Sequence, residues 1–215
     1  MTLEILDVGS GIGNEGMINA YFGGTKDKHV TRLDINPACK PDILHDITQP
    51  LPEEYRGKFD VVFSCHMLEH MGRQEVFPVM RNIASAVKNM GEVWIIVPDM
   101  LWAAQQVVAG RDGMQVQGLL YGAQRPDNPW DLHKSGFTLH ALRRMMEIIG
   151  LVIKRATQEE FIMLLEDKQF NCMQNICIGA RYDGLNSEER PAEQTVVRKF
   201  EFDKGEKNEQ KVESE

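Results

Sequence analysis

The sequence lacks the long apolar runs and the leader pattern that direct a chain into or across a membrane. No apolar stretch approaches the roughly 20 residues that a membrane-spanning helix needs. Residues 1–6 lead directly into a strand-like segment carrying Glu4, which differs from the pattern of a secretory signal peptide. We therefore expect a cytoplasmic protein that makes no membrane contact.

Paired cysteines and clusters of basic residues are also missing. No two of the four cysteines form a C-x-x-C pair or part of an evident zinc set. We expect them to be reduced, packed thiols rather than disulfides. No basic stripe is present that could follow a phosphate backbone, and the net charge is -8, so a long nucleic acid is not expected as a substrate.

The negative charge is concentrated near the end of the chain. From Asp183 onward there are ten acidic and six basic residues, which accounts for four of the eight excess charges. Its final run GEKNEQKVESE, residues 205–215, is polar and lacks aromatic residues. We expect one domain over residues 1–182, followed by a flexible tail over residues 183–215.

What the sequence does contain, close to its start, is a glycine-rich turn after a short apolar strand. In LEILDVGSGIGNEG, residues 3–16, Asp7 is followed by Gly9, Gly11 and Gly13 on alternate positions. Glycine has no Cβ, so the backbone can turn tightly at these positions and approach a ligand closely. The pattern predicts a cofactor-binding loop.

Asp7 helps to decide between two kinds of cofactor. Gly11, Gly13 and Gly16 also satisfy the G-x-G-x-x-G pattern of dinucleotide-binding proteins, in which a diphosphate sits on the helix N-terminus. A carboxylate at the strand end would repel that diphosphate, whereas it would attract a cationic amino or sulfonium group. A nicotinamide-dependent oxidoreductase is therefore kept only as the alternative.

An acidic residue followed by G-x-G-x-G resembles the first motif of the class I S-adenosylmethionine-dependent methyltransferases. The resemblance implies that Asp34, about twenty residues past the glycines, binds both ribose hydroxyls. It also implies that Asp46 lies near the adenine amino group and that Ile47 contacts the ring. An ordinary strand-end or turn role is the alternative for each aspartate. The implied cofactor contacts are Asp7, Gly9, Gly11, Gly13, Asp34, Ile35, Asp46, Ile47 and Ser64.

The same resemblance implies a Rossmann-like α/β fold with a seven-stranded, mostly parallel sheet, an antiparallel last strand and helices on both faces. Near-continuous apolar runs at residues 59–64 and 92–97 suit strands that are covered on both sides. Helices are expected at residues 16–22, 76–88, 100–108 and 139–150, the last capped by Thr138. Residues 151–156 and 175–182 are expected to be the final two strands, paired antiparallel, with the state of residues 161–166 left open.

A long insertion separates two of the expected helices. Residues 110–136 are rich in Gly, Pro and Gln and exceed the length of an ordinary connection. We expect the insertion, about residues 101–136, to form a lid over the substrate site. Helices that often precede the first strand in this family are absent from the sequence. The remaining cover is expected from the insertion or from a neighbouring subunit of a homodimer.

Three histidines are expected beside the transferable methyl group, because open α/β sheets bind ligands at the carboxyl ends of their strands. His66 and His70 follow the fourth strand, and His133 lies in the lid. A neutral imidazole can accept a proton from an attacking hydroxyl or amine. We predict His133 as the first candidate for this base, with His66 and His70 as further catalytic candidates. A structural role is the alternative for His70 and His133, and lining the cofactor pocket is the alternative for His66.

The spacing of these residues also raises the question of a metal. His66-x-x-Glu69-His70, with the distal His133, resembles the E-x-x-E-H plus histidine arrangement of plant small-RNA 2′-O-methyltransferases. Here a histidine replaces the first acidic ligand, which would favour a softer ion than magnesium. We assign no metal from the sequence and leave open whether a histidine base or a metal is used.

The family resemblance implies transfer of a methyl group from S-adenosylmethionine. The N-P-P-Y or D-P-P-Y motif of many amino-group methyltransferases is absent, and the corresponding position after the fourth strand is S-C-H-M. We therefore predict a small-molecule or saccharide-type acceptor that is methylated on oxygen. A non-catalytic methyltransferase-like module is a further alternative, although the glycines, Asp7 and Asp34 that such a module would have lost are all present.

Overall fold

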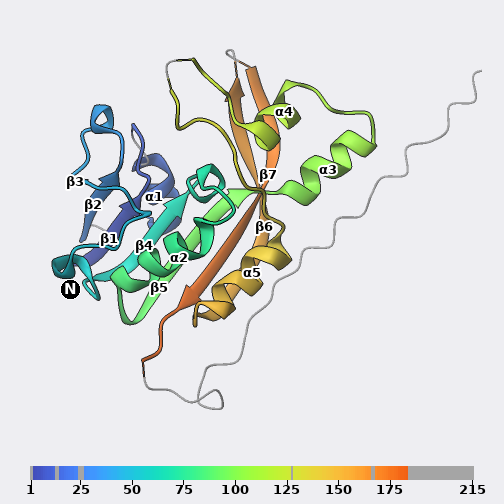
Figure 1. Cartoon of the computed structure of the whole chain (residues 1–215). Coiled ribbons are helices and arrows are strands. Elements are labelled where there is room, and N and C mark those ends of the chain that lie inside the picture. The colour runs from blue at the N-terminus through green and yellow to red at the C-terminus, as the bar shows by residue number, and fades with distance from the viewer. Residues whose placement is uncertain (1, 13–14, 24–26, 127, 166–167, 184–215) are drawn as a thin grey trace, which may run out of the picture.

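The computed structural model describes residues 2–12, 15–23, 27–126, 128–165 and 168–183 (Figure 1). Its sheet has seven strands in the order β3-β2-β1-β4-β5-β7-β6. β7 is antiparallel to both of its neighbours, and the remaining pairs are parallel. The predicted seven-stranded, mostly parallel sheet is confirmed. The strands are β1 (Leu3–Val8), β2 (Lys28–Asp34), β3 (Ile43–Leu44), β4 (Phe59–Cys65), β5 (Val87–Pro98), β6 (Val152–Leu165) and β7 (Lys168–Ala180).

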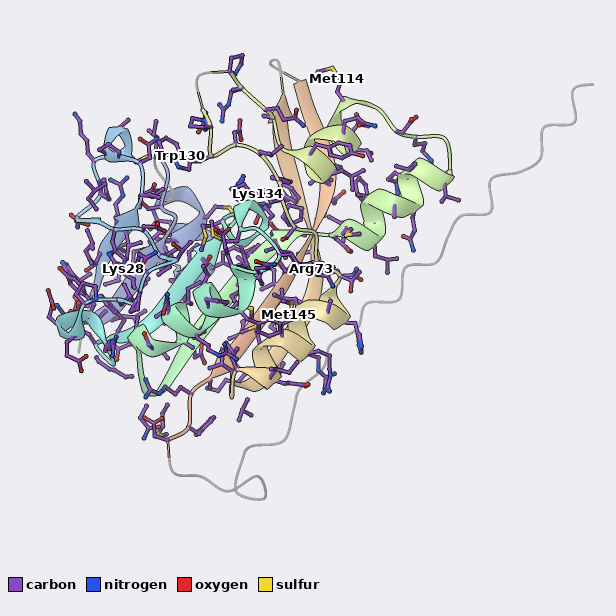
Figure 2. The ribbon with its side chains drawn as sticks, in the orientation of Figure 1. Lys28, Arg73, Met114, Trp130, Lys134 and Met145 are labelled. Carbon is purple, nitrogen blue, oxygen red and sulfur yellow. The ribbon has the colours of Figure 1, made fainter. Side chains whose placement is uncertain are left out.

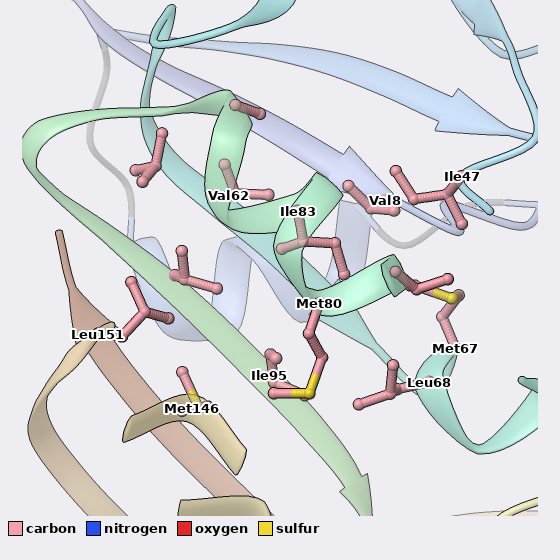
Figure 3. Packing of buried hydrophobic residues seen from close by; sticks show 14 of the residues in the cluster. Val8, Ile47, Val62, Met67, Leu68, Met80, Ile83, Ile95, Met146 and Leu151 are labelled. Carbon is pink, nitrogen blue, oxygen red and sulfur yellow. The ribbon is translucent and has the colours of Figure 1, made fainter. Parts of the chain in front are cut away.

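Helices cover both faces of this sheet. α1 (Glu15–Phe22) packs on one face, and α2 (Val76–Ala86) and α5 (Leu139–Ile148) pack on the other. Successive residues of β1 and β4 point to opposite faces, so each strand feeds two apolar clusters. In the cluster under α2 and α5, Met80, Ile83 and Met146 pack on Val62 and Ile95 (Figure 3).

Two helix boundaries follow from local chemistry. Thr138 lies just before α5, and its hydroxyl accepts a hydrogen bond from the backbone N–H of Ala141 at 3.2 Å, which confirms the predicted cap. α2 ends at Ala86 rather than Lys88, because Val87 already pairs with Phe59 as the first residue of β5. The predicted end of that helix was wrong by two residues, and β5 is correspondingly longer than expected.

The hairpin of β6 and β7 extends well beyond the rest of the sheet. β7 pairs with β5 only from Gln174 to Ala180, whereas its earlier residues pair with β6 alone. The predicted final strands, residues 151–156 and 175–182, were therefore too short, and residue 161 lies within β6. Beyond the edge of β5 one side of the hairpin faces solvent, so polar residues are tolerated there. These polar residues interrupt the apolar run by which a buried strand is predicted from sequence.

α3 (Met100–Val108) and α4 (Met114–Tyr121) pack on this extension (Figure 1). They form a small apolar cluster of their own with Phe161 and Cys172 of the hairpin. The predicted insertion thus contains a helix, α4, and rests on a strand platform. None of the helices in the described ranges is long and apolar enough to cross a membrane. The predicted tail lies outside the described residues, apart from Asp183.

Candidate active site

The glycine turn after β1 adopts the backbone conformation that its sequence predicts. Gly9 has φ +72° and Gly11 has φ +56°, both in the left-handed region that favours glycine. A Cβ on Gly9 would come within 2.3 Å of the Met67 side chain, whereas no atom of the described residues lies within 4 Å of the corresponding position on Gly11. Gly13 lies outside the described residues. The turn therefore leaves an open space beside Gly11.

The contrast between these two glycines gives a testable prediction. Gly9→Ala adds an overlap costing about 1–3 kcal/mol to the about 1–2 kcal/mol of a left-handed alanine. Gly11→Ala carries only the cost of a left-handed alanine, without the overlap, so it is the matched control. Urea unfolding should show the larger loss of stability for Gly9→Ala. Equal losses in the two variants would contradict the close approach of Met67.

Asp34, at the end of β2, holds the glycine turn in place. Its side chain is buried, and its two oxygens accept backbone hydrogen bonds from Gly11 and Asn36, each at 2.8 Å. A carboxylate offers about four lone-pair sites, so it can still accept further hydroxyl donors. Ile35 follows directly and is exposed. The structure thus places Asp34 beside Gly11, with Ile35 exposed directly after it in the chain.

Asp7 and Ser64 lie deeper, at the ends of the two central strands. Asp7 is buried in β1, with Phe63 of β4 as its register partner. Ser64 is opposite Val8 in the same strand pair, and its side chain is fully buried. The hydroxyls of Ser64 and of Ser10, which follows Gly9, have no hydrogen-bond partner among the described residues. Two unsatisfied donors thus lie where the glycine turn leaves the sheet.

Asp46 and Ile47 follow β3. One oxygen of Asp46 accepts hydrogen bonds from the backbone N–H and the hydroxyl of Thr48, at 2.9 and 2.8 Å. Ile47 packs in the core near Met67 (Figure 3), and its backbone carbonyl accepts a bond from Asn82 at 2.8 Å. Asp46 therefore shapes a local turn, and among the described residues no hydrogen bond to its other oxygen is seen.

A pocket of about 950 Å³ lies above the carboxyl ends of β4 and β5. α4 and the segment after it form one wall, and Met17 of α1 and Phe161 of β6 contribute to the other. Cys65, His66, Glu69 and His70 line it from the strand ends, and His133 also reaches it. The structure therefore brings the three predicted histidines and Glu69 together.

His66 is held by hydrogen bonds on both sides of its ring. Its Nδ1 lies 3.3 Å from Glu69 Oε1, and its Nε2 lies 3.1 Å from Gln174 Oε1. The Gln174 amide donates to the hydroxyl of Tyr21 at 2.8 Å, which leaves its oxygen facing the imidazole. Burial lowers the pKa of His66, but the bond and charge of Glu69 outweigh burial and raise it above its ordinary value. Two acceptors therefore favour a protonated ring.

Glu69 belongs to a short 3-10 helix, Leu68–His70, and is 2% exposed. Burial raises the pKa of this carboxyl, but the neighbouring His66, followed by His70 and His133, outweighs burial and holds the pKa below its ordinary value. Its Oε1 faces His66, while Oε2 is buried with no hydrogen-bond partner among the described residues. A buried carboxylate oxygen without a donor is costly, so this atom is a candidate ligand contact.

The segment that carries His133 is tied to this 3-10 helix. The backbone N–H groups of Lys134 and Ser135 donate to the carbonyl of Glu69 at 2.8 and 3.0 Å, and the Ser135 hydroxyl donates to the Met71 carbonyl at 2.7 Å. In Figure 2, Trp130 and Lys134 mark this segment as it runs from α4 toward the strand ends. These bonds fix His133 next to Glu69 and His70.

His70 and His133 both donate from Nδ1 to backbone carbonyls. The acceptors are Leu132, at 3.2 Å from His70, and Leu119, at 2.9 Å from His133. The two rings meet edge to face with centroids 4.9 Å apart. Burial lowers the pKa of His133 below its ordinary value despite the opposing effect of Glu69. An imidazole that donates from Nδ1 has Nε2 as its remaining ring nitrogen, and that nitrogen carries the lone pair in the neutral form.

Sequence reasoning missed the residues that complete this site from other elements. Gln174 of β7 is 108 residues away from His66, and Tyr21 belongs to α1. Phe161 of β6 packs on the His66 ring with centroids 5.0 Å apart. No local pattern in one sequence signals such pairings, because they join residues that are far apart in the chain and meet only in the folded sheet.

A protein-family model described as a methyltransferase domain matches residues 2–155, more than half of the chain. The chain belongs to this family. Membership confirms the resemblance seen in the sequence, and S-adenosylmethionine is the cofactor of this class. Curated protein sequences give no match to this methyltransferase.

Solved structures show the same fold as this methyltransferase. One is an S-adenosylmethionine-dependent methyltransferase of Methanosarcina mazei, with a TM-score of 0.58 and 14% identity, covering 84% of this chain and 93% of that one. Another is the 1,6-didemethyltoxoflavin-N1-methyltransferase of Burkholderia thailandensis, with bound 1,6-didemethyltoxoflavin and S-adenosylhomocysteine. Its TM-score is 0.53 and its identity 15%, covering 85% of this chain and 72% of that one. At these identities the likeness concerns the fold alone.

Proposed function

We propose that this methyltransferase transfers the methyl group of S-adenosylmethionine to an oxygen of a small-molecule or saccharide-type acceptor. The observation that carries this proposal is the pocket of about 950 Å³ that joins His70, His133 and the unpaired oxygen of Glu69 at the strand ends. Its size suits a small ligand. A cluster of basic groups at its base suits an acceptor atom that must lose a proton.

The residues around the glycine turn fit the cofactor. Asp34 would accept the ribose hydroxyls through its remaining lone pairs, while Gly11 leaves the space that the ligand backbone needs. Asp46 would accept from the adenine amino group, with Ile35 beside the ring and Asp7 adding negative charge under the sulfonium end. When bound, the cofactor supplies a methyl group on a positively charged sulfur, which is a good leaving group.

The chain's own residues then have three tasks, which are to orient the acceptor, exclude water and accept a proton. The acceptor oxygen forms a bond to the methyl carbon, the carbon–sulfur bond breaks with its electron pair going to sulfur, and the hydroxyl proton leaves. His133 is the first candidate for a catalytic residue, because its Nε2 carries the lone pair. His70 is the second candidate, and His66, bonded on both sides, would position Glu69.

Labelled methyl transfer to pools of acceptors tests the atom that is methylated. Wild-type protein with methyl-labelled S-adenosylmethionine should label phenols, catechols or sugar hydroxyls and yield O-methyl ethers by NMR. Matched amines and thiols of similar size serve as controls and should remain unlabelled. Exclusive labelling of the amines or thiols would contradict an oxygen acceptor while leaving the cofactor assignment standing.

A further inference from the structure

We propose that Glu69, His70 and His133 bind a divalent transition-metal ion, such as zinc, which holds the acceptor oxygen in the pocket. The role of the ion deepens the proposed function and rests on it, whereas binding of the ion can be tested separately. One potential ligand atom from each residue lies within 4.8 Å of the other two. Small side-chain rotations would bring such atoms to the roughly 2.0–2.2 Å typical of zinc bonds.

The hydrogen bonds of the two imidazoles leave Nε2 of each ring as the candidate ligand atom. Each Nδ1 donates to a backbone carbonyl, Leu132 for His70 and Leu119 for His133. Ligating histidines usually donate their other ring N–H to a carbonyl or carboxylate in this way, which fixes the tautomer and the ring plane. The lone pairs on the two Nε2 atoms therefore need no proton rearrangement to bind a cation.

Glu69 provides an independent indication of a cation. The side chain is 2% exposed, and its Oε2 has no hydrogen-bond partner within the described part of the chain. His66 binds the other oxygen, so it holds the carboxylate without belonging to the ligand set. A cation next to Oε2 would satisfy the atom that the protein leaves unpaired.

The ligand set indicates the kind of ion. Magnesium and calcium prefer oxygen ligands, whereas two imidazoles and one carboxylate suit zinc and neighbouring transition metals. Three protein ligands leave at least one position open, as in catalytic rather than structural zinc sites. All three residues line the pocket of about 950 Å³, so an acceptor oxygen can reach the open position.

A bound ion changes how the hydroxyl loses its proton. By withdrawing charge from the acceptor oxygen it makes that proton more acidic, and the proton passes to water in the pocket. The oxygen then forms its bond to the methyl carbon, and the electron pair of the broken carbon–sulfur bond remains on sulfur. His70 and His133 would act as ligands of the ion rather than as free bases.

The test uses full-length protein without a histidine tag, freed of metal by dialysis against a chelator. Zinc titration by calorimetry, supported by elemental analysis, should show one ion per chain, and cobalt should give the visible absorption bands of a site with mixed nitrogen and oxygen ligands. The single variant Glu69→Gln should weaken zinc binding by at least about tenfold, and so should the double variant that combines His70→Ala with His133→Ala. The matched control, His29→Ala/His45→Ala, removes two histidines elsewhere and should leave binding unchanged.

Binding of S-adenosylhomocysteine, measured on the same samples, separates the two proposals. Unchanged affinity for it in the Glu69 and His70/His133 variants would show that they fold, so their loss of zinc would support the site. Absence of zinc binding in wild-type protein that binds S-adenosylhomocysteine would overturn the metal site alone. Equal zinc affinity in wild type and in His70→Ala/His133→Ala would overturn it as well. Zinc binding without S-adenosylhomocysteine binding would overturn the proposed function and leave the ion site standing.

Discussion

The Asp34→Ala variant is expected to bind S-adenosylhomocysteine at least about 100-fold more weakly than the wild type. The carboxylate would accept two ribose hydroxyls, and each hydrogen bond to a charged group contributes about 1.5–3 kcal/mol. Two such bonds correspond to about 3–6 kcal/mol, or roughly two to four powers of ten in the dissociation constant. The variant also loses the bond from the Gly11 N–H that positions the glycine turn.

Isothermal titration calorimetry measures this loss directly. Asp42→Ala is the matched control, because Asp42 is exposed and accepts a backbone bond from Arg32 of β2, at 2.8 Å, rather than from the glycine turn. We expect the control to keep wild-type affinity. An affinity in Asp34→Ala within twofold of the wild type would refute the ribose assignment.

The His133→Ala variant is expected to lower the turnover number by about 10²–10⁴-fold, the range that removal of a proton acceptor typically costs. The imidazole faces the pocket, and its Nε2 lone pair is the group that would either take the proton or bind an ion. The glycine turn and Asp34 are untouched, so affinity for S-adenosylhomocysteine should not change. The loss should therefore be confined to the methyl-transfer step.

Single-turnover kinetics with an acceptor identified from the labelled pools checks this expectation. His140→Ala serves as the control, because His140 is exposed on α5 outside the pocket lining. It should retain the wild-type rate. An undiminished rate in His133→Ala would exclude this histidine from the chemistry and would also argue against an ion held by it.

The sequence predicts a cofactor end of the site because the features that indicate it are local. Gly9 and Gly11 reveal their conformation through their residue type alone, and Asp34 lies one strand further along the chain. The mostly parallel sheet was implied by the family resemblance, and the apolar run at residues 59–64 agreed with it because that strand is covered on both faces. The glycine turn, the strand-end aspartate and the buried strands each occupy a short stretch of sequence, and the fold class determines which strands lie next to them.

The acceptor end was less predictable because distant segments build it. The β6–β7 hairpin carries two residues to His66: Gln174, where β7 still pairs with the end of β5, and Phe161, in the part of β6 beyond β5. The polar composition of these strands obscured their length. The unpaired oxygen of Glu69 could not be recognised from spacing, since it depends on which of its neighbours donate. His66 was expected to be one of the catalytic histidines, but its two hydrogen bonds favour a positioning role.

Calorimetric titration of the wild-type protein with S-adenosylhomocysteine, followed by NADH under the same conditions, tests the central claim most directly. The carboxylate-flanked glycine turn predicts saturable binding of one S-adenosylhomocysteine per chain and no measurable heat with NADH. Tight binding of NADH without any response to S-adenosylhomocysteine would contradict the account.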